Sequence, residues 1–179
     1  MLHFTIIRKQ LSLQYRKDPS LAGDWANQRV NNSLDDLFLY NDDTFLYQGK
    51  VQSVSNMESL SPGVHFYDTI APGDFKIKAF IGQLVATSHY GRIHGIVGAT
   101  TLNGDYINDD STTANNKTRW EMHDWQSPQP SAPGNDTTVA WSAGCLVVPD
   151  KSLASIGTIF DVYGIKAGDL IAAHLEMEQ

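Results

Sequence analysis

The sequence predicts a mainly β domain, because three of its features agree. Short runs rich in β-branched and aromatic residues, which suit a pleated and half-buried surface, recur between turn residues along most of the chain. Helical periodicity is convincing only near the C-terminus. The 179 residues, 41% of them hydrophobic, are sufficient for one domain with a buried core. We therefore expect a β-rich domain with one or two short helices.

The clearest helix is predicted over residues 150–163, where apolar residues recur at helical spacing. Asp150 or Ser152 can cap its first turn, and Gly164 can end it. Its apolar stripe consists of Leu153, Ile156, Ile159 and Phe160. Residues 33–40 fit either a short helix beginning at Ser33 or a strand. One short helix is thus expected, with a second as an alternative.

Most other segments are predicted as strands separated by turns. In chain order they are two strands about Gly49 within 44–56, a strand, a Pro-Gly turn and a strand within 64–82, single strands within 91–100 and 119–125, a buried strand or helix start within 143–149, and a closing strand within 165–176. Residues 103–118 and 126–138 form polar loops that are longer than a simple connection needs. We expect such loops to border a cleft.

Charge and hydropathy patterns exclude several classes of protein. The chain has 13 basic and 20 acidic residues, and the basic ones are scattered, which argues against a nucleic-acid partner. No apolar run approaches the roughly 20 residues of a membrane helix. The first residues lack the pattern of a signal peptide, so we expect synthesis in the cytoplasm. Asp105, Asn108, Asp109 and Asp110 lack the glycine and glutamate of an EF-hand loop, and we expect no metal or other cofactor.

The single cysteine of the chain, Cys145, is the best candidate for a nucleophile. Gly144 precedes it and allows a sharp turn, so the backbone N–H groups of both residues can point at a developing oxyanion. Ser142 can add a hydroxyl group at the same turn. A lone cysteine is more often a small buried hydrophobic residue, so the nucleophile hypothesis depends on a nearby base.

His123 is the leading candidate for that base. It lies in a strand-like segment before the second long loop, and Asp124 beside it can orient the imidazole ring. The alternative is a half-buried histidine packed between Trp120 and Trp125. His94, which precedes Gly95, is the second candidate for the base or for a residue of the cleft.

These residues resemble the catalytic motif of the L,D-transpeptidase family, in which a histidine is followed at some distance by Ser/Thr-His-Gly-Cys. The matching residues here are His123 and the run from Ser142 to Cys145. Residues 69–77, "TIAPGDFKI", and 163–175, which contain "YGIKAGDLIAAHL", are similar to segments that flank the site in that family. The resemblance extends from about Gly49 to Leu175. Residues 1–48 are therefore expected to be an N-terminal segment packed on a catalytic domain of residues 49–179.

The resemblance implies a β-sandwich or partly open barrel of the L,D-transpeptidase type. It also implies a cysteine peptidase or acyl transferase that acts on peptidoglycan stem peptides. Cys145 would be the nucleophile, His123 the base, Asp124 the orienting residue, and Gly144 with Cys145 the oxyanion donors. The sequence "WSAGC" is similar to a variant of this site in phage-encoded proteins. Without a signal peptide, such an enzyme would reach the wall after release, injection or virion delivery.

Departures from the family motif favour hydrolysis over transfer. Ala143 replaces the second histidine, and Val147 stands where an arginine is common. One alternative is a wall-binding or virion structural β-domain in which Cys145 is a small hydrophobic residue packed in the core. A zinc hydrolase that uses His94, His123 and an acidic residue is another, although the chain has no closely spaced pair of ligands.

Overall fold

The computed structural model of the chain describes residues 1–9, 15–17, 27–29, 35–54, 69–83, 92–100, 120–124 and 145–179. These residues form ten strands and one helix. In chain order they are β1 (Leu2–Arg8), β2 (Tyr15–Lys17), β3 (Asn27–Arg29), β4 (Asp35–Asn41), β5 (Thr44–Val51), β6 (Gly73–Gln83), β7 (Arg92–Val97), β8 (Glu121–Asp124), β9 (Leu146–Val148), α1 (Asp150–Val162) and β10 (Leu170–Met177). The prediction of a mainly β fold is confirmed.

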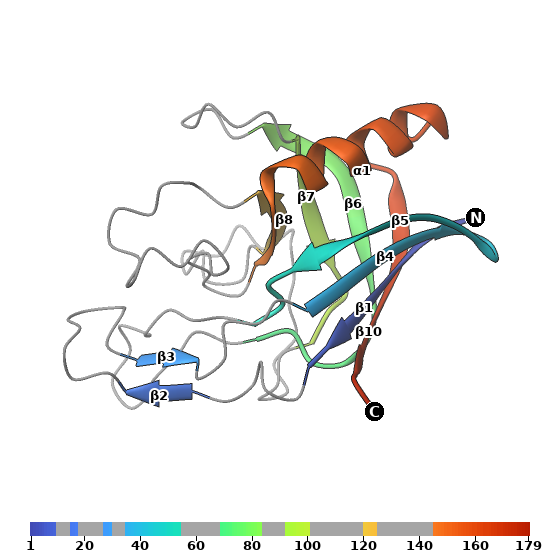
Figure 1. Ribbon diagram of the computed structural model, residues 1–179. Coiled ribbons are helices and arrows are strands. Elements are labelled where there is room, and N and C mark those ends of the chain that lie inside the picture. The colour runs from blue at the N-terminus through green and yellow to red at the C-terminus, as the bar shows by residue number, and fades with distance from the viewer. Residues whose placement is uncertain are drawn as a thin grey trace.

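Eight of the strands form one sheet in the order β5-β4-β1-β10-β6-β7-β8-β9. Its two edges approach each other where Gln52, just after β5, pairs with Val147 of β9. The N–H of Gln52 donates to the carbonyl of Val147 over 2.7 Å, and the reverse bond measures 3.1 Å. The sheet is therefore nearly closed into a barrel (Figure 1). β2 and β3 pair in a separate two-stranded sheet.

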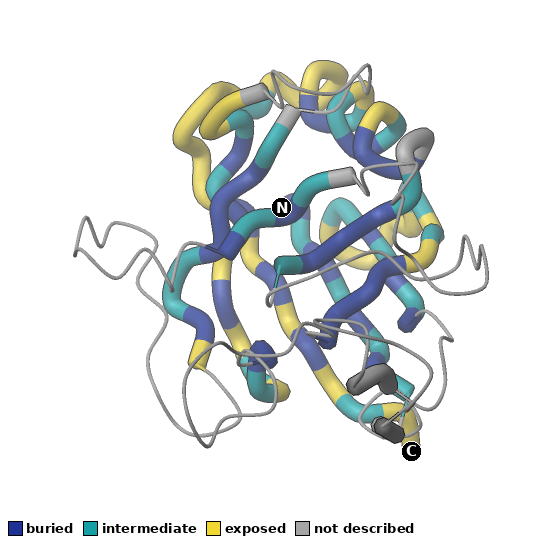
Figure 2. Tube along the Cα trace, turned by 90° about the vertical axis from the view of Figure 1, so that its left-hand side faces the viewer, coloured by how far each residue is buried: buried dark blue, intermediate teal, exposed yellow. Residues whose placement is uncertain are grey.

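Alternation along the strands separates the core from the outer face. In β1 the residues Leu2, Phe4, Ile6 and Arg8 are buried and those between them are half-buried. β10 repeats the pattern with buried Ile171, Ala173 and Leu175 between exposed neighbours. Figure 2 shows this change of burial along the tube. Such a period of two is what a strand with one core-facing side requires.

The predicted helix is confirmed as α1, which crosses the top of the sheet in Figure 1. Leu153, Ile156 and Phe160 of its apolar stripe are buried in the core. Its start differs from the prediction, because Pro149 is the N-cap and no side chain caps the helix. Gly164 follows its end with a φ of 70°, a left-handed conformation that glycine adopts readily. No helix among the described residues is long and apolar enough to cross a membrane.

The N-terminal residues differ most from the expectation. We expected residues 1–48 to pack as a segment on a domain of residues 49–179. β1 instead lies between β4 and β10 inside the sheet, and the expected boundary falls within β5. β5 also continues through Gly49, where two strands were predicted. Residues 35–41 form strand β4, so the strand alternative holds there.

A buried polar network at the end of β1 was not predicted. The Arg8 guanidinium is completely buried, and its Nε donates to the hydroxyl of Ser53 over 2.8 Å. It also donates to the carbonyls of Ile70 and Ser53, each over 2.7 Å. The Ser53 hydroxyl in turn donates to Asp35 over 2.5 Å. These bonds compensate for burying the arginine and join β1, β4 and the segments after β5 and before β6.

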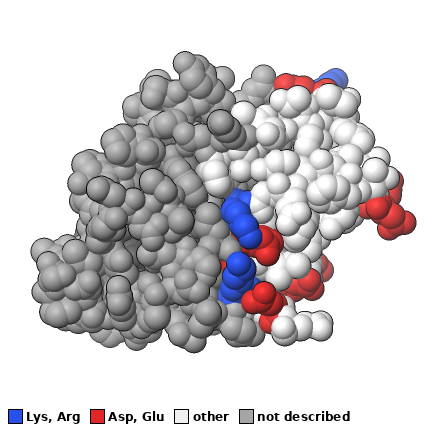
Figure 3. All heavy atoms as spheres, in the orientation of Figure 1, with Lys and Arg blue, Asp and Glu red and all other residues white. Residues whose placement is uncertain are grey.

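The outer face carries charges of both signs. Figure 3 shows lysine or arginine side chains beside aspartate and glutamate side chains on the described part of the visible face. Lys50 forms an ion pair with Asp36 across β5 and β4. Exposed pairs of this kind contribute little to stability. On this face the described residues show no extended basic surface of the kind that binds a phosphate backbone.

Candidate active site

The register of β8 and β9 determines how Cys145 and His123 lie. The two strands are parallel, with Met122 opposite Leu146 and His123 opposite Val147. Cys145 directly precedes Leu146, so it is level with Glu121. Because side chains alternate along a strand, Glu121, His123, Cys145 and Val147 share the face opposite to that of Met122 and Leu146.

Cys145 and His123 are therefore diagonal neighbours on adjacent strands. Such neighbours have Cβ atoms roughly 7–8 Å apart, a distance that longer side chains can bridge. Both residues are half-buried, whereas Met122 and Leu146 beside them are completely buried. The two residues that the sequence singled out thus lie on one side of the sheet, at its β8–β9 edge.

Glu121 is the residue at this site that the sequence analysis missed. Its backbone forms a hydrogen bond to the Cys145 thiol, and its carboxylate acts on the thiol through space. The signal was present, since a strand that carries His123 must place the residue two positions earlier on the same face. A carboxylate beside a cysteine changes the chemistry of the site, because it disfavours a second negative charge.

The environment of Cys145 keeps it a thiol at neutral pH. Burial raises its pKa from 9.0 to about 11, and the negative charge of Glu121 adds to this, while backbone hydrogen bonds oppose it. The pKa is thus raised, whereas an imidazolium beside a reactive cysteine lowers it. A reaction at Cys145 has to remove the thiol proton as the sulfur attacks, which requires a base beside it.

His94 lies on the other side of the sheet. It pairs with Met122 of β8, and none of its surface is exposed. Its Nδ1 accepts a hydrogen bond from the backbone N–H of Phe80 over 3.0 Å. The ring centroids of Phe80 and Phe160 lie 5.3 and 5.1 Å from its own. His94 is therefore a core residue, and the alternative prediction that it lines a cleft or acts as the base is wrong.

The position of His94 also argues against the zinc alternative. His94 and His123 face opposite sides of the sheet, so they cannot bind one ion together. Within the described ranges, no group of three or more histidine, cysteine, aspartate or glutamate residues is arranged to hold a metal. The chemistry that the described residues offer is that of a thiol, an imidazole and a carboxylate on one face.

Other predicted site residues lie outside the described part of the chain. Ser142 and Gly144 fall outside the described residues, and of Asp124 only the backbone, at the end of β8, is described. The predicted oxyanion donor at Gly144 and the orienting role of Asp124 therefore stay predictions. The same is true of the two long loops that were expected to border a cleft.

Comparison with known proteins identifies one relative over nearly the whole chain. A protein of Treponema pallidum (strain Nichols), described as an uncharacterized protein, is 32% identical over 180 residues. The alignment covers 96% of this chain and 78% of the relative. No protein-family model and no solved structure matches the chain.

Proposed function

The chain belongs to the family of this Treponema pallidum protein, and we propose that it is a cysteine hydrolase of peptidoglycan stem peptides. The observation that carries the proposal is the placement of Cys145 and His123 on the same face of adjacent strands. The resemblance of the run from Ser142 to Cys145, preceded by His123, to the L,D-transpeptidase motif supports the substrate class. The enzyme acts on the wall after release, injection or virion delivery.

The reaction begins with attack of the Cys145 sulfur on the carbonyl carbon before a D-residue. The thiol proton passes to the His123 imidazole in the same step, because the raised pKa leaves little thiolate at neutral pH. The imidazolium then gives this proton to the leaving amine as the C–N bond breaks, which leaves a thioester. Glu121, on the same face, opposes a free thiolate at Cys145, so the proton leaves as the sulfur attacks.

Water completes the cycle. His123 takes a proton from a water molecule, whose oxygen attacks the thioester carbonyl. The C–S bond breaks, the imidazolium returns its proton to the sulfur, and the product leaves as a carboxylic acid that gives its own proton to water. Hydrolysis is favoured over transfer because Ala143 and Val147 replace residues that could hold an acceptor peptide in the family that the motif resembles. The expected product is a stem peptide that has lost its terminal D-residue, or an opened cross-link.

The experiment is incubation of the whole chain with peptidoglycan-derived tetrapeptides, followed by mass spectrometry. Wild-type protein should release the terminal D-residue, and Cys145→Ala should release none. His174→Ala is a matched control, because His174 lies on β10 and pairs with Asp74 over 2.6 Å, away from β8 and β9. A product that is mainly cross-linked dimer would contradict hydrolysis, and equal activity of Cys145→Ala would contradict the proposal.

A second candidate is a wall-binding or virion structural domain, and the raised pKa of Cys145 favours it. In that case Cys145 is a packed hydrophobic residue. Cys145→Ala would then lower the free energy of unfolding, and wild-type protein would sediment with purified peptidoglycan without cleaving it. The substrates tested are all stem peptides and all purified cross-linked dimers. If the protein binds peptidoglycan but releases no product from any of them, the result favours this candidate.

A further inference from the structure

The two edges of the sheet meet beside the strand that carries Cys145 at its start. β9 is a short strand at one edge of the sheet, paired with β8 on one side. On its other side, among the described residues, Gln52 pairs with Val147 through two backbone hydrogen bonds. Val147 follows Cys145 by two positions. This bridge, the seam of the barrel, therefore holds the side of β9 that faces away from β8.

Gln52 is followed by Ser53, whose polar groups are all held by Arg8 and Asp35. The Ser53 hydroxyl donates to Asp35 over 2.5 Å and accepts from Arg8 Nε over 2.8 Å. The Ser53 N–H donates to the same Asp35 oxygen over 3.3 Å, and the Ser53 carbonyl accepts from Arg8 over 2.7 Å. Rotation of the backbone at Ser53 would break several of these bonds at once, so its conformation is fixed.

A single peptide group joins this network to the seam. It consists of the Gln52 carbonyl and the Ser53 N–H, which point in opposite directions in a planar trans peptide. The carbonyl accepts from the Val147 N–H over 3.1 Å, and the N–H donates to Asp35 over 3.3 Å. A tilt of this group changes both bonds. Because Arg8, Asp35, Gln52 and Ser53 are all buried, water does not replace bonds that are lost there.

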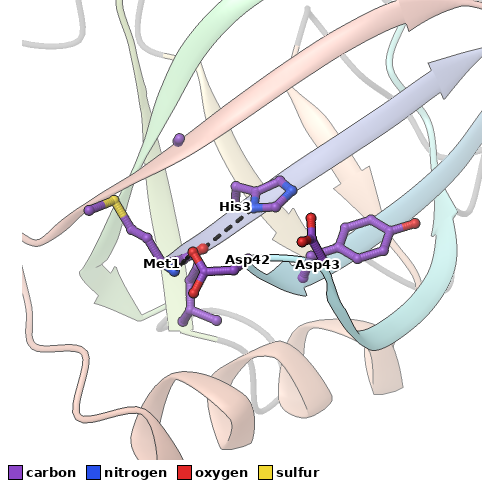
Figure 4. A pocket seen from close by; sticks show the side chains of 7 residues that line it. Met1, His3, Asp42 and Asp43 are labelled. Atoms are coloured by element: carbon purple, nitrogen blue, oxygen red, sulfur yellow. Dashed lines mark hydrogen bonds and ion pairs between the residues drawn. The ribbon is translucent and has the colours of Figure 1, made fainter.

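The opposite end of β1 provides a comparison. There β1 and β4 are joined by the ion pair between the Met1 amino group and Asp42, beside an open hollow. Figure 4 shows both residues close to His3. Their side chains are 95% and 74% exposed, so solvent screens this pair. Of these two links between β1 and β4, the buried one continues to the seam.

We propose that Arg8 and Asp35 are positioning residues for the strand that carries Cys145. They fix Ser53, which fixes the peptide group at the seam, and the seam keeps β9 beside β8. In that arrangement Cys145 and His123 share a face. A strand held on both sides keeps the sulfur in one position relative to the base, which catalysis requires. This part in catalysis rests on the proposed function.

Hydrogen exchange of the isotope-labelled full chain, followed by NMR, tests the seam directly. In the wild type the N–H of Val147 should exchange slowly, as should that of Ala79, which is bonded away from the seam. Ser53→Ala removes the shared hydroxyl, so exchange at Val147 should accelerate about tenfold more than at Ala79. An unprotected Val147 N–H in the wild type would overturn the proposal. Equal acceleration at the two amides in Ser53→Ala would do the same.

Matched variants separate positioning from a general loss of stability. Asp35→Asn replaces an accepting oxygen with an NH₂ group at the buried link, and Asp42→Asn makes the same change at the exposed link. The first should accelerate exchange at Val147 selectively, and the second should not. Ile6→Val shortens a core side chain of β1 outside the network, so it should affect Val147 and Ala79 equally. Selective acceleration in Asp42→Asn or Ile6→Val would overturn the proposal.

Catalysis and thiol reactivity provide the second readout. Ser53→Ala should lower kcat for stem-peptide hydrolysis about tenfold and leave KM within about twofold, because the change acts on alignment and not on substrate contacts. It should also accelerate alkylation of Cys145 at pH 8, because a loosened β9 buries the thiol less. Unchanged kcat and unchanged alkylation would overturn the positioning role. A wild-type protein that hydrolyses no stem peptide contradicts the proposed function instead, and the exchange and alkylation rates still test the seam.

Discussion

His94 and His123 lie on neighbouring strands, yet their surroundings are opposite. His94 pairs with Met122, the residue directly before His123, and is completely buried. His123 follows on the other face, half-buried, with Cys145 and Glu121 on its side. Met122 and His123 are successive residues of β8, so their side chains point to opposite faces. This alternation places His94, opposite Met122, in the core and His123 on the other face. Histidine content and spacing alone do not distinguish the two.

The side chain of His94 contacts an irregularity in the pairing of β6 with β7. The pairing of β6 with β7 shifts between Lys78 and Gly82, and Phe80 in this bulge has a φ of 51°. The N–H of Phe80 donates to His94 Nδ1. Its ring meets Phe160 of α1 edge-on at 5.6 Å. His94 thus supplies the acceptor for a backbone N–H at the bulge and joins the helix to the sheet.

The largest expected effect concerns His123. Replacing it with alanine should lower the rate of stem-peptide hydrolysis about 10²- to 10⁴-fold, the usual contribution of a general base. Because the side chain is half-buried, the free energy of unfolding should change by less than about 1 kcal/mol. The measurements are the rate of product release and the urea midpoint. If His123→Ala instead lost much stability and kept its activity, His123 would be a structural residue like His94 and not the base.

His94→Ala should act mainly on stability. It leaves a cavity beside Phe80 and Phe160 and removes the acceptor of the Phe80 N–H, so the expected loss is about 2–4 kcal/mol. His94→Asn keeps an acceptor at the position of Nδ1 and should lose less. Urea denaturation compares the two variants. An alanine variant as stable as the wild type would show that the interior histidine is dispensable.

The reactivity of Cys145 tests the other side of the sheet. A pKa raised from 9.0 to about 11 lowers the thiolate fraction near neutral pH about 100-fold. Iodoacetamide should therefore alkylate the folded protein at pH 8 much more slowly than the unfolded chain, and the rate should keep rising with pH above 9. Mass spectrometry follows the reaction. Alkylation that reaches its plateau below pH 8 would mean that His123 does activate the thiol.

The smallest effect is expected from Glu121. Its carboxylate raises the pKa of Cys145, so Glu121→Gln should lower that pKa and accelerate alkylation severalfold. Glu176→Gln, on the outer face of β10, is the control. Slower alkylation of Glu121→Gln would mean that the carboxylate does not repel the thiolate.

Local pattern in the sequence was sufficient for a good part of this fold. The stripe of Leu153, Ile156 and Phe160 predicted α1, and apolar runs predicted β7, β8 and β10, while the run at β9 fitted either a strand or the start of a helix. Cys145 and His123 could also be singled out from the sequence as a candidate nucleophile and base, because such residues are recognisable by type and by their turn and strand context. Such signals extend over a few residues, so neighbouring residues are enough to read them.

Only the tertiary structure decided what depends on pairing between distant residues. His3 lies beside Ala172, and Gln52 meets Val147, although nothing in either local segment specifies its partner. Long-range pairing made the N-terminal strand an interior strand, buried Arg8 among its acceptors and moved His94 into the core. It also set the pKa of Cys145, because desolvation and the charge of Glu121 depend on which groups surround the thiol, and that is a property of the packed sheet.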